Sequence, residues 1–223
     1  MRTALLDLDG TLVDSGSLIV EHLAKAIATA GLPVPEPTVL QTFVGPPFET
    51  ALPAIGLSDE QTRAVIHAYR QSYDPVAAHA TPIYAGVPET LARLRDAGLR
   101  LALATSKPEH LARRIAAGTG LDRFLTETVG ADDTVGRVGK DKVVAEALRR
   151  LAIDPDADPV IMVGDRHHDV DGAAAHGIRC IGVGWGYAVP GELAGAELVV
   201  DDLAELEQVL LGEDIWRAAG AAA

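Results

Sequence analysis

The sequence has one cysteine, few aromatic residues and few basic residues, and each shortage excludes a class of protein. With Cys180 alone, no disulfide within the chain is possible, and its apolar neighbours predict a buried, unreactive thiol. The 19 basic and 32 acidic residues give a formal charge of -13, which argues against binding to nucleic acid or to an anionic membrane. The sequence shows no basic-then-apolar leader and no apolar run of about 20 residues, so we expect a soluble, cytoplasmic protein.

Short apolar runs alternate with helical patterns along most of the chain. The predicted buried strands are 3–8, 100–105, 125–130, 160–165, 179–184 and 197–200. Apolar residues at helical spacing predict the helices 86–97, 140–151, 169–175 and 203–211. This alternation indicates an α/β fold with a doubly wound, Rossmann-like parallel sheet.

A long stretch between the first two predicted strands carries only helical patterns. One apolar stripe consists of Ile19, Leu23, Ile27 and Ala30. Ser58 and Gln61 match a capping box, which predicts a helix that runs to about Gln71. We therefore expect an all-α cap inserted into an α/β core. The expected boundaries are 17–80 for the cap, 1–16 and 81–212 for the core, and 213–223 for a C-terminal tail.

Two aspartates end the first predicted strand in the stretch LLDLDGT. Asp7 and Asp9 are two residues apart, so their side chains leave the same side of the strand if the strand persists. Two carboxylates this close repel each other unless a cation lies between them. Taken alone, the pair fits equally well a turn at Asp9-Gly10 with Asp7 as a solvated strand end.

Further polar residues stand at the ends of other predicted strands. Asp165 ends the strand 160–165, and Asp169 begins the next helix, where it also fits a helix cap. Carboxylates gathered at one sheet edge suit an Mg²⁺ ion that also contacts a substrate phosphate. Thr105 and Ser106 offer hydroxyls and amides to an anion, although Ser106 and Glu109 also match a capping box.

A lysine begins the helix predicted over 140–151. The helix dipole disfavours a cation at this end, so a functional reason for Lys140 is indicated. Lys142, two residues later, is the alternative to Lys140 as the lysine whose side chain points inward to the phosphate.

Four segments in order resemble the motifs of the haloacid dehalogenase superfamily of phosphohydrolases. They are DLDGTLVDS, ATSKP, the helix start at Lys140, and VGDRHHD. The resemblance runs from residue 3 to about residue 200. The helical insertion resembles the C1 cap of phosphoglycolate-phosphatase-like members, and FVGPP, ATSKP and VGDRHHD resemble the 5′-nucleotidase-like members.

The resemblance implies an Mg²⁺-dependent phosphomonoester hydrolase that forms an aspartyl-phosphate. It implies Asp7 as the nucleophile and Asp9 as the general acid and base, with Thr105 and Lys140 completing the catalytic set. It implies metal binding by Asp7, by the backbone carbonyl of Asp9 and by Asp165, with Asp169 in support. The implied phosphate-binding residues are Gly10, Thr11, Thr105, Ser106 and Lys140.

We expect the cap to select the substrate, a small phosphorylated metabolite, with phosphoglycolate or a nucleoside 5′-monophosphate favoured. The candidate specificity residues are Gly45, Pro46, Arg166 and His167. Arg166 and His167 fit equally well as surface residues at a helix start. The presence of Asp9 disfavours dehalogenation, and Lys25 in the cap is interpreted as a solvated helix residue rather than a Schiff-base lysine.

Other functions remain open to the sequence. A β-phosphoglucomutase-like phosphomutase or a pyrophosphatase is the alternative enzyme. A phospho-receiver module without enzymatic turnover is the alternative from another class, although it has no need of a cap. The sequence leaves monomer and homodimer equally open.

Overall fold

The structure is a computed structural model, and it describes residues 1–216. Within these residues a six-stranded parallel sheet has the order β3-β2-β1-β4-β5-β6. The strands are β1 (Thr3–Leu6), β2 (Arg100–Pro108), β3 (Glu127–Ala131), β4 (Val160–Gly164), β5 (Arg179–Val183) and β6 (Leu198–Val200). The chain continues from β1 to β2 on one side, and β4 pairs with the other side of β1. In α/β sheets, ligands bind where the strand order reverses in this way, which here is the carboxyl end of β1.

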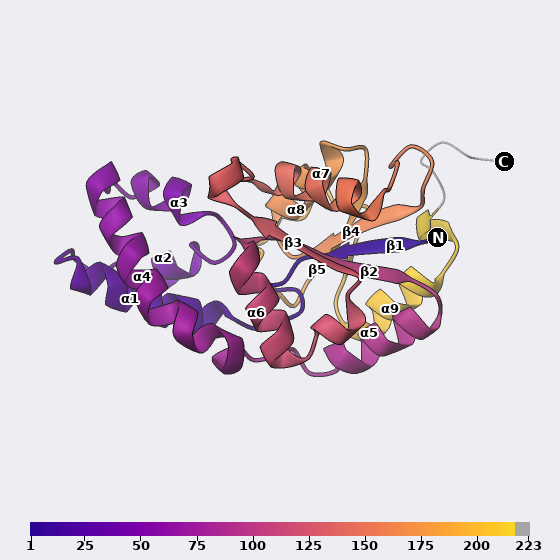
Figure 1. Ribbon diagram of the computed structural model, residues 1–223, viewed down its shortest axis with the longest axis horizontal. Coiled ribbons are helices and arrows are strands. Elements are labelled where there is room, and N and C mark those ends of the chain that lie inside the picture. Colours follow the sequence, from indigo (N-terminus) through magenta and orange to yellow (C-terminus); the bar gives the residue numbers. More distant parts are fainter. Residues whose placement is uncertain (217–223) are drawn as a thin grey trace.

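Helices cover both faces of the sheet, which confirms the doubly wound α/β fold (Figure 1). On one face lie α5 (Val87–Asp96), α6 (Glu109–Thr119) and α9 (Leu203–Leu211), and on the other lie α7 (Lys140–Leu151) and α8 (His167–Ala174). Leu6 of β1 packs on the face covered by α5, α6 and α9, whereas Leu5 packs on the face covered by α7 and α8. Successive side chains of a strand point to opposite faces of the sheet, which explains this alternation. Short 3₁₀ turns occur at η1 (Asp122–Phe124), η2 (Asp133–Val135) and η3 (Asp214–Trp216).

The stretch between β1 and α5 forms a helical insertion beside the sheet (Figure 1). Its helices are α1 (Gly16–Thr29), α2 (Pro37–Gln41), α3 (Phe48–Ala54) and α4 (Asp59–Ala80). The capping box of α4 is confirmed, because the Gln61 amide donates to Ser58 Oγ and the Ser58 amide donates to Gln61 Oε1. The predicted end near Gln71 is wrong. The buried stripe continues through Tyr73 and Ala77, and this packing extends the helix past Pro75.

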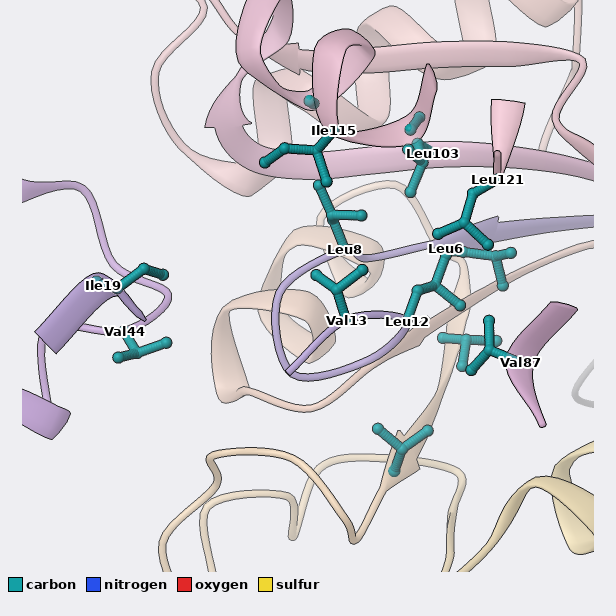
Figure 2. Close-up of a cluster of buried hydrophobic side chains, with 14 of the residues drawn as sticks. Leu6, Leu8, Leu12, Val13, Ile19, Val44, Val87, Leu103, Ile115 and Leu121 are labelled. Atoms are coloured by element: carbon teal, nitrogen blue, oxygen red, sulfur yellow. The ribbon is translucent and has the colours of Figure 1, made fainter. Parts of the chain in front are cut away.

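One buried apolar cluster joins the insertion to the sheet. Figure 2 shows Leu8 close to Ile115 of α6, with Ile19 and Val44 on the side of the insertion. Val13 lies beside Leu8 and Leu12 in this view, in the segment that leads from β1 into α1. The insertion is therefore packed against the core through shared apolar side chains rather than through polar contacts alone.

Two predicted boundaries at the sheet edge are wrong. β1 ends at Leu6 rather than at residue 8, and β2 continues through Pro108 rather than ending at Thr105. Proline disfavours the helical conformation in the residue before it, so Lys107 stays extended and α6 begins only at Glu109. The capping box expected between Ser106 and Glu109 is therefore absent, because Pro108 is the N-cap residue of α6 and makes no side-chain cap.

The first part of the expected tail is folded. In η3, Ile215 is buried and the Trp216 indole donates to the carbonyl of Leu210. The remainder, 217–223, lies outside the described residues. Cys180 is buried as predicted, and burial raises the pKa of its thiol. Across residues 1–216, every helix is too short or too polar to cross a bilayer.

Candidate active site

Six charged side chains meet at the carboxyl end of β1, and all six are buried. Four are acidic and two are basic: Asp7, Asp9, Asp165, Asp169, Lys107 and Lys140. The sheet explains this convergence, because β1 lies between β2 and β4 and all three strands run in the same direction. Buried charges are costly unless they are paired, so this cluster is the candidate functional site of the protein.

Three carboxylates form an acidic trio within the cluster. Asp7, Asp165 and Asp169 can each bring one oxygen within 4.8 Å of the other two. Burial raises the pKa of Asp165 to about 8, and the charges of Asp169 and Asp7 add to this effect. Burial also raises the pKa of Asp7 to about 6, although Lys140 opposes the shift. The trio brings together more negative charge than one lysine balances, and its hard oxygen donors fit Mg²⁺.

Lys140 is the first residue of α7, and its side chain turns inward to the trio. Its Nζ lies 2.8 Å from Asp7 Oδ1 and 2.6 Å from Asp169 Oδ1, and it donates to the carbonyl of Ala104. Burial would lower the pKa of Lys140, but the charges of Asp169 and Asp7 outweigh burial and raise it. Lys142 is exposed and donates to the carbonyl of Gly136, so Lys140 is the lysine at this site.

Asp9 lies outside the trio and has a lysine of its own. Lys107 Nζ is 3.1 Å from one carboxylate oxygen of Asp9 and 2.9 Å from the other. Ser15 also donates to Asp9, and the ammonium of Lys107 lies 5.0 Å from the ring centroid of Tyr73 on α4. Lys107 is not among the candidate residues predicted from the sequence. Its position two residues after Thr105 in the ATSKP segment is the signal that identifies it, because i and i+2 share a face of a strand.

The expected phosphate-binding residues surround the same sheet edge. Thr105 is buried, and its hydroxyl accepts from the Lys107 amide at 3.3 Å. Thr11 donates to Asp165 Oδ1 at 3.4 Å. At Gly10, where φ is +80°, a Cβ would lie 2.1 Å from Asp165 Oδ2, so only glycine permits this close approach. Ser106 lies within β2 and does not begin a helix, and it lines a cavity, described below, between the insertion and the core.

The loop after β5 connects the trio to the start of the insertion. The Tyr187 amide donates to Asp165 Oδ2 at 2.7 Å. The Tyr187 hydroxyl accepts from the Gly16 amide at 2.7 Å and donates to Asp14 at 2.9 Å. One residue therefore contacts both a carboxylate of the trio and the first residue of α1.

A cavity of about 110 Å³ lies between the insertion and the core, beside Asp9 and Lys107. Its walls are largely apolar and aromatic: Ile19, Phe43, Phe48, Ile66, Tyr69, Tyr73 and Leu111. The Phe48 and Tyr69 rings meet edge to face at 4.8 Å, and Tyr69 stacks on Tyr73 at 4.9 Å. Such walls suit a flat or apolar group better than a strongly charged one.

The four candidate specificity residues have different placements. Gly45 and Pro46 line the cavity, as residues in contact with a substrate would. Arg166 and His167 are absent from its lining, and both side chains contact Glu192 instead, at 2.6 Å and 2.7 Å. Both residues stand at the start of α8, and their role in substrate specificity stays a prediction.

Comparisons with known proteins agree with this architecture. A model of the family described as haloacid dehalogenase-like hydrolase matches residues 4–183. The tyrosine-protein kinase PtkA of Mycobacterium tuberculosis is 44% identical over 186 residues, which are 83% of this chain and 63% of that relative. A 5′-nucleotidase of Pseudomonas aeruginosa is 32% identical over 209 residues. The match covers 92% of this chain and 94% of that relative. The crystal structure of a predicted phosphatase from Clostridium acetobutylicum has a TM-score of 0.87 at 31% identity, covering 94% of this chain and 98% of that one.

Proposed function

The chain belongs to the haloacid dehalogenase-like hydrolase family, and we propose that it is an Mg²⁺-dependent phosphatase of small phosphomonoesters. The observation that carries the proposal is the separate pairing of two neighbouring aspartates with two different lysines. Asp7 pairs with Lys140 beside the acidic trio, and Asp9 pairs with Lys107 beside the cavity. This arrangement supports two different roles for the two carboxylates.

In the first proposed step, an oxygen of Asp7 attacks phosphorus, and the bond from phosphorus to the ester oxygen breaks. The product on the protein is an aspartyl-phosphate, and the alcohol leaves with a proton donated by Asp9. Lys140 holds Asp7 in place through one carboxylate oxygen. The proposed contacts to the phosphoryl oxygens come from Lys140, Thr105 and the amides of Gly10, Thr11 and Ser106.

In the second proposed step, Asp9 takes a proton from water, and the resulting hydroxide oxygen attacks the phosphorus of the aspartyl-phosphate. Free phosphate leaves, and the Asp7 carboxylate is restored. This step needs a carboxylate at Asp9, and Lys107 is the cation that contacts it. Ser15 and Lys107 also fix the orientation of the Asp9 side chain at the cavity.

Mg²⁺ fits the residues that are present. Asp7 and Asp165 would hold it together with the backbone carbonyl of Asp9, and Asp169 lies within reach as a supporting group. When bound, the ion supplies the positive charge that a phosphoryl group and three carboxylates together require. The raised pKa values of Asp7 and Asp165 are the observation that supports this assignment.

The cavity walls favour a nucleoside 5′-monophosphate over phosphoglycolate. The carboxylate of phosphoglycolate requires a cation that the protein has not already paired. Among the described residues that line the cavity, Arg70, Lys107 and His110 each already face a carboxylate of the protein. An uncharged ring would instead meet the aromatic side chains of Phe48 and Tyr69, which supports a nucleoside 5′-monophosphate as the substrate.

A phosphate-release screen with Mg²⁺ tests the proposal. The substrates are nucleoside 5′-monophosphates, phosphoglycolate, sugar phosphates and pyrophosphate, with the Asp7→Asn variant as the control. We expect the highest kcat/KM for a nucleoside 5′-monophosphate. Release of phosphate from none of these compounds would overturn the proposal. Conversion of a hexose phosphate without free phosphate favours a phosphomutase, and a phosphorylated Asp7 that persists for hours favours a receiver module.

Phosphoryl transfer to a tyrosine is a second candidate, favoured by the identity to the relative that is named a tyrosine-protein kinase. In that reaction a phenol oxygen, in place of water, attacks the aspartyl-phosphate formed from a nucleoside triphosphate. Incubation with ATP and a tyrosine-containing peptide separates the two functions. Labelled peptide supports the kinase, and free phosphate alone supports the phosphatase.

A further inference from the structure

Arg166 joins two separate parts of the molecule. It follows Asp165 in the core, and its Nε lies 2.6 Å from Glu192 Oε1. Its Nη1 donates to the carbonyl of Val44 in the insertion. The Arg166 side chain is 12% exposed and that of Glu192 is 6% exposed, so this charge pair is largely removed from water. A guanidinium is suited to such a place because its planar fork serves two acceptors at once.

The loop that Arg166 contacts forms part of the cavity wall. Val44 is followed by Gly45 and Pro46, which both line the cavity. Gly45 has a φ of +112°, and a Cβ at this position would lie 3.2 Å from Arg166 Nη1. The loop therefore passes directly over the guanidinium, in a backbone conformation that glycine adopts readily.

The partner carboxylate is itself held firmly. Glu192 accepts from Arg166, from His167 Nδ1 at 2.7 Å and from the Val189 amide at 2.9 Å. Burial would raise the pKa of Glu192, but these hydrogen bonds lower it to about 2. Glu192 therefore remains a carboxylate, and Arg166 has a fixed anchor in the core.

The backbone of Arg166 connects this anchor to the acidic trio. Its amide donates to Asp169 Oδ2 at 3.1 Å, and Asp169 Oδ1 lies 2.6 Å from Lys140. Arg166 thus contacts Asp169 of the acidic trio through its backbone amide and the carbonyl of Val44 through its side chain.

We propose that Arg166 is a positioning residue that holds the Val44–Gly45–Pro46 loop against the core and so sets the cavity wall that meets the leaving group. It acts through the loop and does not touch the substrate. The contact between Arg166 and the carbonyl of Val44 does not depend on which reaction the protein catalyses. The expected effect of Arg166 on kinetics rests on the proposed function.

Hydrogen exchange and steady-state kinetics of Arg166→Gln test the proposal together. The Val44 amide donates to the carbonyl of Gln41, so its exchange reports on the loop. Loss of a hydrogen bond to a charged donor should speed this exchange about tenfold or more. We expect a KM for p-nitrophenyl phosphate about tenfold higher, with kcat for acetyl phosphate, which has a small leaving group, within about twofold of wild type. Arg166→Lys should recover only part of the loss, because a single ammonium serves one partner.

Arg93→Gln is the matched control. Arg93 also forms an ion pair with a glutamate, Glu207, which joins α5 to α9 away from the cavity. This pair is more exposed to water, with side chains 54% and 18% exposed. This variant should leave both the Val44 exchange and the KM unchanged. If Arg166→Gln does not fold, Glu192→Gln weakens the same anchor and should change both measurements in the same direction.

Three results decide the question. Unchanged Val44 exchange in a folded Arg166→Gln protein overturns the proposal. An equal loss of kcat for both substrates also overturns it, because Arg166 would then act at the reacting centre. Faster Val44 exchange in a protein whose wild type hydrolyses no phosphomonoester refutes the proposed function and leaves the loop contact supported.

Discussion

Replacing Asp165 by asparagine should stabilise the metal-free protein at neutral pH while it removes a ligand from the proposed metal site. Asp165 is fully buried, and its carboxylate lies in the acidic trio. Asparagine has nearly the same shape and keeps an oxygen that can accept from the Tyr187 amide. The change therefore removes a carboxyl group that must take up a proton on folding at neutral pH, with little change in packing. Function and stability are opposed at this position, as at many ligand sites.

The expected magnitude follows from the pKa. The ordinary value of 3.8 is raised to about 8 in the folded protein, chiefly by burial. A folded pKa above the unfolded one means that ionisation opposes folding, and this cost grows as the pH rises from about 4 to about 8. One pKa unit corresponds to about 1.4 kcal/mol, so the cost is about 4 kcal/mol at pH 7 and about 2 kcal/mol at pH 5. Removing this cost stabilises the variant, but burying the asparagine NH₂ without a hydrogen-bond partner offsets about 1–3 kcal/mol of that stabilisation.

Urea unfolding in EDTA at pH 5 and pH 7 measures the effect, and the NH₂ penalty cancels between the two conditions. The stability of Asp165→Asn relative to wild type should be about 2–3 kcal/mol more favourable at pH 7 than at pH 5. Adding Mg²⁺ at about 100 times its Kd should stabilise wild type by about 2.7 kcal/mol and the variant by much less. A difference that stays constant or shrinks with rising pH would refute the reasoning.

Three other substitutions test the two aspartate–lysine pairs and the loop after β5. Asp7→Asn should abolish phosphate release in a folded protein, and wild-type turnover would exclude Asp7 as the nucleophile. Lys107→Met should lower the free energy of unfolding by about 3 kcal/mol, because it leaves the Asp9 carboxylate buried without its partner; urea unfolding measures this, and unchanged stability would contradict it. Tyr187→Phe should cost about 1–2 kcal/mol, because the Gly16 amide loses its acceptor; an unchanged melting temperature would mean that water replaces the hydroxyl.

Much of the fold follows from local periodicity. The helix predicted over 203–211 matches α9, and each predicted strand overlaps an observed one. The errors have particular causes. Pro108 keeps Lys107 extended and lengthens β2, whereas Pro75 fails to end α4 because tertiary packing of Tyr73 outweighs its local effect. Tertiary packing of this kind is not encoded in a short sequence window.

The candidate site was predictable to the extent that it depends on strand ends. Parallel strands that end at one edge bring Asp7 and Asp165 together whatever the side-chain details are, and Lys140 joins them from the start of α7. The pairing of Lys107 with Asp9 was not predictable in this way, because it needs the extended end of β2 and the ring of Tyr73 from the insertion. The contacts of Arg166 likewise depend on Glu192, which is distant in the sequence.

The two aspartates after β1 acquire different surroundings because the strand ends before them. The Asp7 amide still donates to the carbonyl of Val163, so Asp7 continues the line of the sheet and faces the trio. The backbone then turns at Leu8 and Gly10, and Asp9 points to Lys107 and the cavity. Phosphoryl transfer needs a nucleophile where charge is neutralised and an acid where the leaving group departs. A strand that continued through residue 9 would place both carboxylates on one face. The early end of β1 is therefore what separates the two environments that the proposed reaction requires.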